Sequence, residues 1–319
     1  MAKRTIIIAG SGVFGTAIAE RLAWNTENQV LIYARKNEVV DEINSIHKNS
    51  KSFSTRYINK NIKAFSDLQT FSKASFIFLA IPSKAILSFC SKISKYVNEN
   101  TLIINLAKGM SAEGAFITEK LPFKRKASMK GPTFAIELLN GFPSAFTFGG
   151  EKHDYLQIKD EVLKNTALTL DYTLDIRAVE LLSILKNMYA IAIGLVSGRY
   201  NSPNVDFLIY TKSVNEMRRF LILFGCEPST IFKYCGIGDL GLTSLNDLSR
   251  NRTLGLLVGK GFLVDNKSST VIEGYRTIKV MHDKTKENDL VDDYPIVTAL
   301  YKLMYKEETL TDYINTVFK

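Results

Sequence analysis

Two polar residues interrupt a long apolar stretch in the middle of the chain, and they are the first candidates for chemistry. Lys186 and Asn187 lie within residues 179–196, a segment too hydrophobic to form a surface helix. A buried lysine is costly unless it has a partner or a task, such as general acid–base catalysis. The alternative is a lysine at the edge of a helix, with its stem buried and its ammonium in solvent.

A second candidate is the glycine-rich segment at residues 236–241, which surrounds Asp239 and leads to Thr243. Its three glycines indicate a backbone that approaches something closely. The carboxylate of Asp239 is a candidate partner for a lysine ammonium. A glycine-rich surface loop is the alternative interpretation.

Two further segments place cations where an anionic ligand could bind. Ser249 suits the N-cap of a predicted helix, and Arg250 beside the exposed helix amides suits a phosphate or carboxylate. Lys108 lies between Ala107 and Gly109, directly after a predicted strand. In open α/β sheets, ligands bind at the carboxyl ends of strands, so Lys108 is placed where a substrate could meet a cofactor.

The N-terminal glycine loop predicts a dinucleotide site. It lies between a predicted strand at residues 5–9 and a helical pattern at 16–23, which is the context that this motif requires. Gly10 permits the tight turn, Gly12 lets the backbone approach a pyrophosphate, and Gly15 allows close packing of helix on strand. A plain strand–helix turn is the alternative. The predicted cofactor-binding residues of the loop are Gly10, Ser11, Gly12, Val13, Phe14 and Gly15.

The residue after the second predicted strand bears on the choice between NAD and NADP. An acidic residue there would bind the ribose hydroxyls of NAD, but the chain has Arg35. Arg35 could pair with the 2′-phosphate of NADP and stack on the adenine. Alternatively, Arg35 is exposed and Glu38 contacts the ribose. NADP is the preferred prediction, and NAD stays open.

The elements that position these residues follow from hydrophobic patterning. Near-continuous apolar runs are typical of strands buried on both faces, and so of a parallel sheet covered by helices. Beyond residue 175 the pattern becomes helical. We therefore expect a dinucleotide-binding domain at residues 1–178 and a mostly helical substrate-binding domain at 179–319. The predicted strands are residues 5–9, 30–34, 76–81, 102–106, 126–129 and 145–148.

Composition narrows the class of protein. The 319 residues are 46% hydrophobic with a net charge of +9, and the basic residues are scattered, with residues 124–126 the longest purely basic run. A solvated lysine-rich surface is therefore favoured over a nucleic-acid partner. The three cysteines fit no disulfide or zinc pattern, so no metal is expected. No signal peptide or membrane span is expected either, which predicts a cytoplasmic protein with a small-molecule substrate.

Taken together, the motifs resemble the NAD(P)-dependent glycerol-3-phosphate dehydrogenases over nearly the whole chain. The resemblance implies a Rossmann-like N-terminal domain with a helical C-terminal domain. It also implies reversible hydride transfer between NAD(P)H and dihydroxyacetone phosphate, giving sn-glycerol 3-phosphate for phospholipid synthesis. The matching segments are residues 10–17, 107–109, 131–137, 185–194, 236–243, 249–251 and 273–274.

The resemblance also implies roles for individual residues. Lys186 resembles the general acid–base, and Lys108 and Asp239 complete the catalytic group. Cofactor contacts are implied for Lys108, Arg250 and Glu273, in addition to the glycine loop and Arg35. The implied substrate-binding residues are Lys108, Asn187, Asp239, Thr243, Arg250 and Asn251.

Residues 198–207 depart from the family pattern, being bulkier and more acidic after the Lys-Asn helix. This departure bears on domain packing and on oligomer contacts, so a homodimer stays an open prediction. Two other functions compete. A ketopantoate-reductase-like dehydrogenase would lack the combination of residues 238–240 with 249–251. A non-catalytic NAD(P) sensor would have no use for Lys186 or Asp239.

Overall fold

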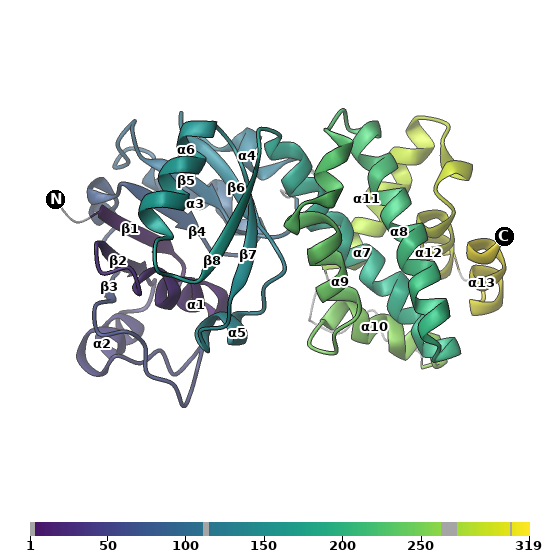
Figure 1. Cartoon of the computed structure of the whole chain (residues 1–319), viewed down its shortest axis with the longest axis horizontal. Coiled ribbons are helices and arrows are strands. Elements are labelled where there is room, and N and C mark those ends of the chain that lie inside the picture. Colours follow the sequence, from purple (N-terminus) through teal and green to yellow (C-terminus); the bar gives the residue numbers. More distant parts are fainter. Residues whose placement is uncertain (1–3, 111–114, 263–272, 307) are drawn as a thin grey trace. The chain divides into compact units, whose positions relative to one another are not determined.

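The computed structural model describes residues 4–110, 115–262, 273–306 and 308–319. The chain divides into two compact units, Met1–Glu180 and Leu181–Lys319, and each is considered by itself (Figure 1). Helix α7, Ile176–Tyr200, begins in the first unit and continues through the second. The division into a dinucleotide-binding domain and a substrate-binding domain after residue 178 stays a proposal, because no break in α7 marks that point.

The first unit is built on a sheet of eight described strands in the order β3-β2-β1-β4-β5-β6-β7-β8. All six predicted strands are present, whereas β3 and β8 were not predicted. The expectation of a wholly parallel sheet is wrong at one pair, since β6 and β7 run antiparallel. The chain leaves β6 and re-enters at the same end of the sheet, after only the short helix α5, Ala135–Leu139. The strands are β1 Arg4–Ala9, β2 Asn28–Tyr33, β3 Lys63–Phe65, β4 Phe76–Leu79, β5 Leu102–Asn105, β6 Lys126–Lys130, β7 Ser144–Gly149 and β8 Leu168–Thr173.

Strand β1 shows why the central strands are continuously apolar. Ile6 and Ile8 are buried in one hydrophobic core, and Ile7 and Ala9 are buried in another. Because successive side chains of a strand point to opposite faces, a strand covered on both faces needs apolar residues throughout. The helices and helical turns of this unit are α1 Val13–Leu22, α2 Asn37–Ile46, η1 Leu68–Lys73, α3 Ser83–Ile93, α4 Ile117–Lys120, α5 Ala135–Leu139, α6 Lys152–Gln157 and η2 Ile158–Val162.

The strand order reverses at β1, which pairs with β2 on one side and with β4 on the other. The segments that follow β1 and β4 therefore lie side by side at the carboxyl end of the sheet. Gly10 has a φ of +130°, and a Cβ there would lie 2.7 Å from the carbonyl oxygen of Ala80. Only glycine fits so close a turn. The reversal point is where open α/β sheets bind ligands.

The second unit is helical, as the sequence pattern predicts. Its central helix α7 is apolar and long enough to span a membrane, yet its most apolar stretch is entirely buried within the protein. It is therefore a core helix. The remaining elements are α8 Pro203–Leu223, η3 Pro228–Phe232, η4 Tyr234–Gly238, α9 Asp239–Ser244, α10 Arg250–Gly259, α11 Glu273–Glu287, η5 Val291–Asp293, α12 Pro295–Tyr305 and α13 Leu310–Phe318.

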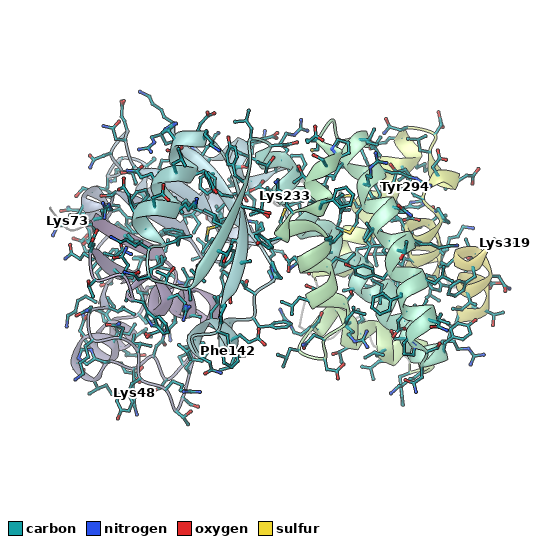
Figure 2. The ribbon with its side chains drawn as sticks, viewed as in Figure 1. Lys48, Lys73, Phe142, Lys233, Tyr294 and Lys319 are labelled. Atoms are coloured by element: carbon teal, nitrogen blue, oxygen red, sulfur yellow. The ribbon has the colours of Figure 1, made fainter. Side chains whose placement is uncertain are left out.

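Basic side chains are found on the exterior of both units. Lys73 and Lys319 are exposed and point away from the ribbon (Figure 2). This placement supports the interpretation of the net charge as a solvated, lysine-rich surface.

Candidate active site

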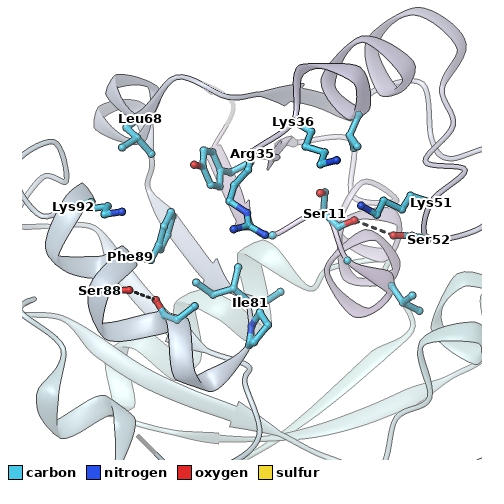
Figure 3. Close-up of a pocket in the computed structure, with 18 residues that line it drawn as sticks. Ser11, Arg35, Lys36, Lys51, Ser52, Leu68, Ile81, Ser88, Phe89 and Lys92 are labelled. Atoms are coloured by element: carbon cyan, nitrogen blue, oxygen red, sulfur yellow. Dashed lines mark hydrogen bonds between the residues drawn. The ribbon is translucent and has the colours of Figure 1, made fainter. Parts of the chain in front are cut away.

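A pocket of about 550 Å³ opens at the carboxyl end of the sheet in the first unit. Its walls come from the glycine loop after β1, the end of β2, the segment after β4, and α3 (Figure 3). The pocket therefore lies at the reversal point of the sheet, where a dinucleotide would bind. The lining residues include Gly10, Ser11, Gly12, Val13, Tyr33, Arg35, Lys36, Lys51, Ser52, Ala80, Ile81, Pro82, Ser88, Phe89 and Lys92.

The glycine loop has the geometry that a pyrophosphate needs. A Cβ on Gly12 would meet nothing within 4 Å, so the backbone there is open to a ligand. Gly12 is the N-cap of α1 and supplies no side-chain cap, which leaves the helix amides available to an anion. The carbonyl of Ser11 accepts hydrogen bonds from Asn49 Nδ2 at 2.8 Å and Ser52 Oγ at 2.9 Å, and these bonds fix the shape of the loop.

Two of the six loop residues predicted to bind the cofactor, Phe14 and Gly15, could contact it only through backbone amides in the first turn of α1. Phe14 packs against the hydrophobic core. A Cβ on Gly15 would lie 2.2 Å from the carbonyl oxygen of Gly10, so this glycine serves the packing of α1 on the loop. Gly10, Ser11, Gly12 and Val13 line the pocket.

Four cationic side chains line the pocket: Arg35, Lys36, Lys51 and Lys92. Arg35 reaches into it from the end of β2, with Lys36 and Lys51 on one side of it and Lys92 on the other (Figure 3). The described lining residues include no aspartate or glutamate, and Glu38 is not among them. Sequence reasoning identified Arg35 but missed the three lysines. Lys36 is its neighbour, whereas Lys51 and Lys92 come from segments that no spacing rule connects to the loop.

In the second unit, Lys186 on α7 and Asp239 at the start of α9 form an ion pair. Their side chains are 0% and 2% exposed. The alternative in which the ammonium of Lys186 reaches solvent from a helix edge is therefore wrong. The surface-loop interpretation of residues 236–241 is also wrong, because they form η4 and α9. A Cβ on Gly236 would lie 2.0 Å from the carbonyl oxygen of Ile231, so this glycine allows the tight turn before Asp239.

The neighbouring Asn187 is joined to Asn251 of α10, whose Nδ2 donates to Asn187 Oδ1 at 3.2 Å. Close packing of α7 on α10 makes this contact possible. A Cβ on Gly194 would lie 2.4 Å from the carbonyl oxygen of Arg252, so a larger residue would push the helices apart. The two asparagines thus add neutral polar groups next to Lys186 in the sequence and on α10.

The remaining predicted substrate residues of the second unit lie on the same helices. Thr243 is buried one turn after Asp239 on α9. Ser249 is the N-cap of α10 as predicted, and its side chain accepts a bond from the amide of Arg252. Arg250 is exposed at the first position of that helix. Arg252 is instead held within the unit, through bonds to Ser244 and Ser197.

For two further predicted site residues the structure describes less. Lys108 is half-buried in the first unit, three residues after the end of β5. Glu273 is the first residue of α11, and its side chain lies outside the described residues. Their roles stay predictions.

A dinucleotide pocket at the reversal point of an α/β sheet, in a chain that also buries a lysine–carboxylate pair in a helical unit, defines an NAD(P)-dependent oxidoreductase. Sequence comparison specifies which one. The model of the NAD-dependent glycerol-3-phosphate dehydrogenase N-terminus matches residues 5–155, and that of the C-terminus matches residues 175–315. The chain belongs to the NAD-dependent glycerol-3-phosphate dehydrogenase family.

Individual relatives agree with the family models. The chain is 32% identical over 316 residues to glycerol-3-phosphate dehydrogenase [NAD(P)+] of Methanothermobacter thermautotrophicus, covering 97% of this chain and 96% of the relative. The crystal structure of glycerol-3-phosphate dehydrogenase from Coxiella burnetii has the same fold, with a TM-score of 0.87 at 24% identity and full coverage of both chains. A ketopantoate reductase from Ralstonia eutropha is a distant neighbour, at a TM-score of 0.57 and 12% identity over 95% of this chain and 99% of the other. Both of these structural likenesses extend to the fold alone.

Proposed function

We propose that this protein transfers a hydride between NAD(P)H and C2 of dihydroxyacetone phosphate, giving sn-glycerol 3-phosphate for phospholipid synthesis. The buried ion pair of Lys186 and Asp239 carries the proposal. A pair of buried charges is costly and is weak support for stability alone, so a task in catalysis accounts for its presence.

The pocket of the first unit fits a dinucleotide. Gly12 leaves room for a close approach, and the uncapped amides of α1 favour the pyrophosphate. When bound, the nicotinamide supplies the hydride. Arg35, with Lys36 and Lys51 beside it, provides a site for a 2′-phosphate, so we propose NADP as the preferred cofactor and NAD as the alternative.

The lysine–carboxylate pair supplies the proton. As the hydride reaches C2, negative charge develops on the attached oxygen, and Lys186 Nζ donates a proton to it. The carboxylate of Asp239 forms an ion pair with the ammonium and keeps it oriented in the helical unit. In the reverse direction Lys186 takes the proton back from the C2 hydroxyl.

The substrate phosphate and hydroxyls need donors around this pair. We assign that task to Asn187, Thr243, Arg250 and Asn251, of which Arg250 alone carries a charge. Lys108 of the first unit is assigned to the same reaction and to cofactor binding. Arg250 and Glu273 are assigned contacts to the cofactor as well.

We place the protein in the cytoplasm, acting on a small phosphorylated substrate without a nucleic-acid partner. The odd number of cysteines, all of them free in the described structure, suits a reducing compartment. We leave the homodimer as a prediction, and residues 198–207 are the segment expected to influence contacts between two copies of the chain.

The activity is tested by following NAD(P)H absorbance with purified protein. Both cofactors are tried against dihydroxyacetone phosphate and against dihydroxyacetone, which lacks the phosphate. We expect turnover with the phosphorylated ketone and a far higher KM for the unphosphorylated one. Equal activity on the two ketones would contradict the assigned phosphate site, and reduction of neither would contradict the function.

A further inference from the structure

Three buried polar side chains gather in the first unit at the carboxyl ends of β5 and β6. They are Asn105, Lys130 and Glu180, which are 1%, 3% and 2% exposed. None of them has a role in the reaction proposed above. Two of the three can carry charge, and charged side chains are almost never fully buried unless they are paired.

Asn105 lies at the centre of this cluster. Its Nδ2 donates to Glu180 Oε1 at 2.5 Å, and its Oδ1 accepts from the backbone amide of Ala107 at 3.0 Å. Its own carbonyl oxygen accepts from Lys130 Nζ at 2.6 Å. Glu180 Oε2 in turn accepts from the backbone amide of Thr118 at 3.3 Å. Asn105, the last residue of β5, therefore forms hydrogen bonds through both its side chain and its backbone carbonyl.

These contacts fix the direction in which the chain leaves β5. The amide held by Asn105 belongs to Ala107, the residue directly before Lys108. Bonds in which one partner is ionised are shorter and stronger than neutral ones, and burial strengthens them further. The side chain of Asn105 is therefore held by Glu180 while it holds the turn that carries Lys108.

We propose that Asn105, braced by Glu180 and Lys130, is a positioning residue for Lys108. The proposal rests on the function assigned to Lys108. It explains why the polar side chains of Asn105, Lys130 and Glu180 are buried next to the turn that follows β5 and carries Lys108. An enzyme gains from such bracing because a small misplacement of a substrate-contacting group costs activity without unfolding the protein.

A double-mutant cycle tests the proposal. The variants are Asn105→Ala, Lys108→Ala and the double variant, and the quantity measured is kcat/KM for dihydroxyacetone phosphate. We expect Asn105→Ala to lower kcat/KM about tenfold in the native background and less than about twofold when Lys108 is already absent, as coupled neighbours behave. Thr101→Val is the matched control. Thr101 lies just before β5 at its other end, is equally buried and bonds to Ala74, so its loss affects stability without reaching Lys108.

If Asn105→Ala does not fold, Glu180→Gln gives a milder test, since the charge is lost and the single amide oxygen can accept from Asn105 or from the Thr118 amide but not from both. Its effect on kcat/KM should also depend on Lys108. An equal loss of kcat/KM in the presence and in the absence of Lys108 would overturn the positioning role and leave the function of Lys108 intact. If Lys108→Ala alone leaves kcat/KM unchanged, the role assigned to Lys108 fails, and the positioning role fails with it.

Discussion

Lys186 of α7 and Asp239 of α9 form an ion pair whose two side chains are almost completely removed from solvent. The pair depends on the turn at residues 234–238, after which the start of α9 lies beside α7. In a low-dielectric surrounding, a lysine held by a carboxylate is a pre-oriented proton donor. The relationship links the fold of the second unit directly to the proposed chemistry.

Replacing Lys186 with alanine should remove the proton donor. We expect kcat for dihydroxyacetone phosphate to fall about 100-fold or more, which is within the range that general acid–base groups contribute. NADPH binding, measured by fluorescence titration, should be unchanged because Lys186 is not among the residues that line the dinucleotide pocket or are assigned to the cofactor. Lys212→Ala on α8 is a control lysine from the same unit. A kcat within about twofold of wild type would remove Lys186 from the mechanism.

Replacing Arg35 with alanine should discriminate between the two cofactors. The KM for NADPH should rise about tenfold or more, since a hydrogen bond to a charged group contributes about 1.5 kcal/mol or more. The KM for NADH should change little, because NADH lacks the 2′-phosphate. Lys73→Ala, an exposed lysine outside the pocket, serves as the control. An unchanged ratio of the two KM values would instead support ribose recognition and NAD.

Replacing Arg250 with alanine should weaken binding of the substrate phosphate. The KM for dihydroxyacetone phosphate should rise about tenfold, by the same estimate for a bond to a charged group. The KM for the cofactor should rise much less. Arg218→Ala removes another exposed arginine, from α8, and should affect neither. If Arg250→Ala matches that control, the assignment of Arg250 to the phosphate is wrong.

A buried carboxyl in the second unit predicts a pH-dependent stability. Glu216 of α8 accepts hydrogen bonds from the Tyr189 hydroxyl at 2.9 Å and from the amide of Ile296 at 2.7 Å, near the start of α12. Burial raises the pKa of Glu216 to about 7, although these bonds and nearby Arg219 oppose the shift. Tyr294, the N-cap of α12, supplies no side-chain cap, so the carboxyl of Glu216 caps that helix instead.

Proton linkage determines whether Glu216 makes the protein more or less stable as the pH rises. The folded protein keeps a proton on Glu216 at pH values where the unfolded chain has lost it, so the contribution of Glu216 to stability is greatest below about pH 4.5 and is lost as the pH rises through about 7. We expect the Glu216 contribution to the free energy of unfolding to fall by about 3 kcal/mol over that window. Denaturant titrations at several pH values compare wild type with Glu216→Gln, which cannot titrate. Parallel pH profiles for the two proteins would refute this expectation.

The sequence by itself determined the local parts of this protein. The apolar runs gave six of the eight described strands, because strands covered on both faces require apolar residues. The order of residues 10–15 between strand and helix identified the dinucleotide loop, because Gly10 and Gly15 have no room for a side chain and Gly12 leaves the backbone open to a ligand. Lys186 was singled out because a charged residue in an apolar helix is rare. These signals are local, so they can be read without knowing the fold.

Only the tertiary structure decided which distant residues meet. Lys186 and Asp239 come from different helices, and a turn that looked like a surface loop brings them together. Lys51 and Lys92 join Arg35 through loops and helices whose paths no spacing rule describes. Asn105 lies within a predicted strand and carries no signal in the sequence, and only the fold places Glu180 and Lys130 beside it. Such contacts depend on packing between elements, and burial and pairing of polar groups are properties of the folded chain.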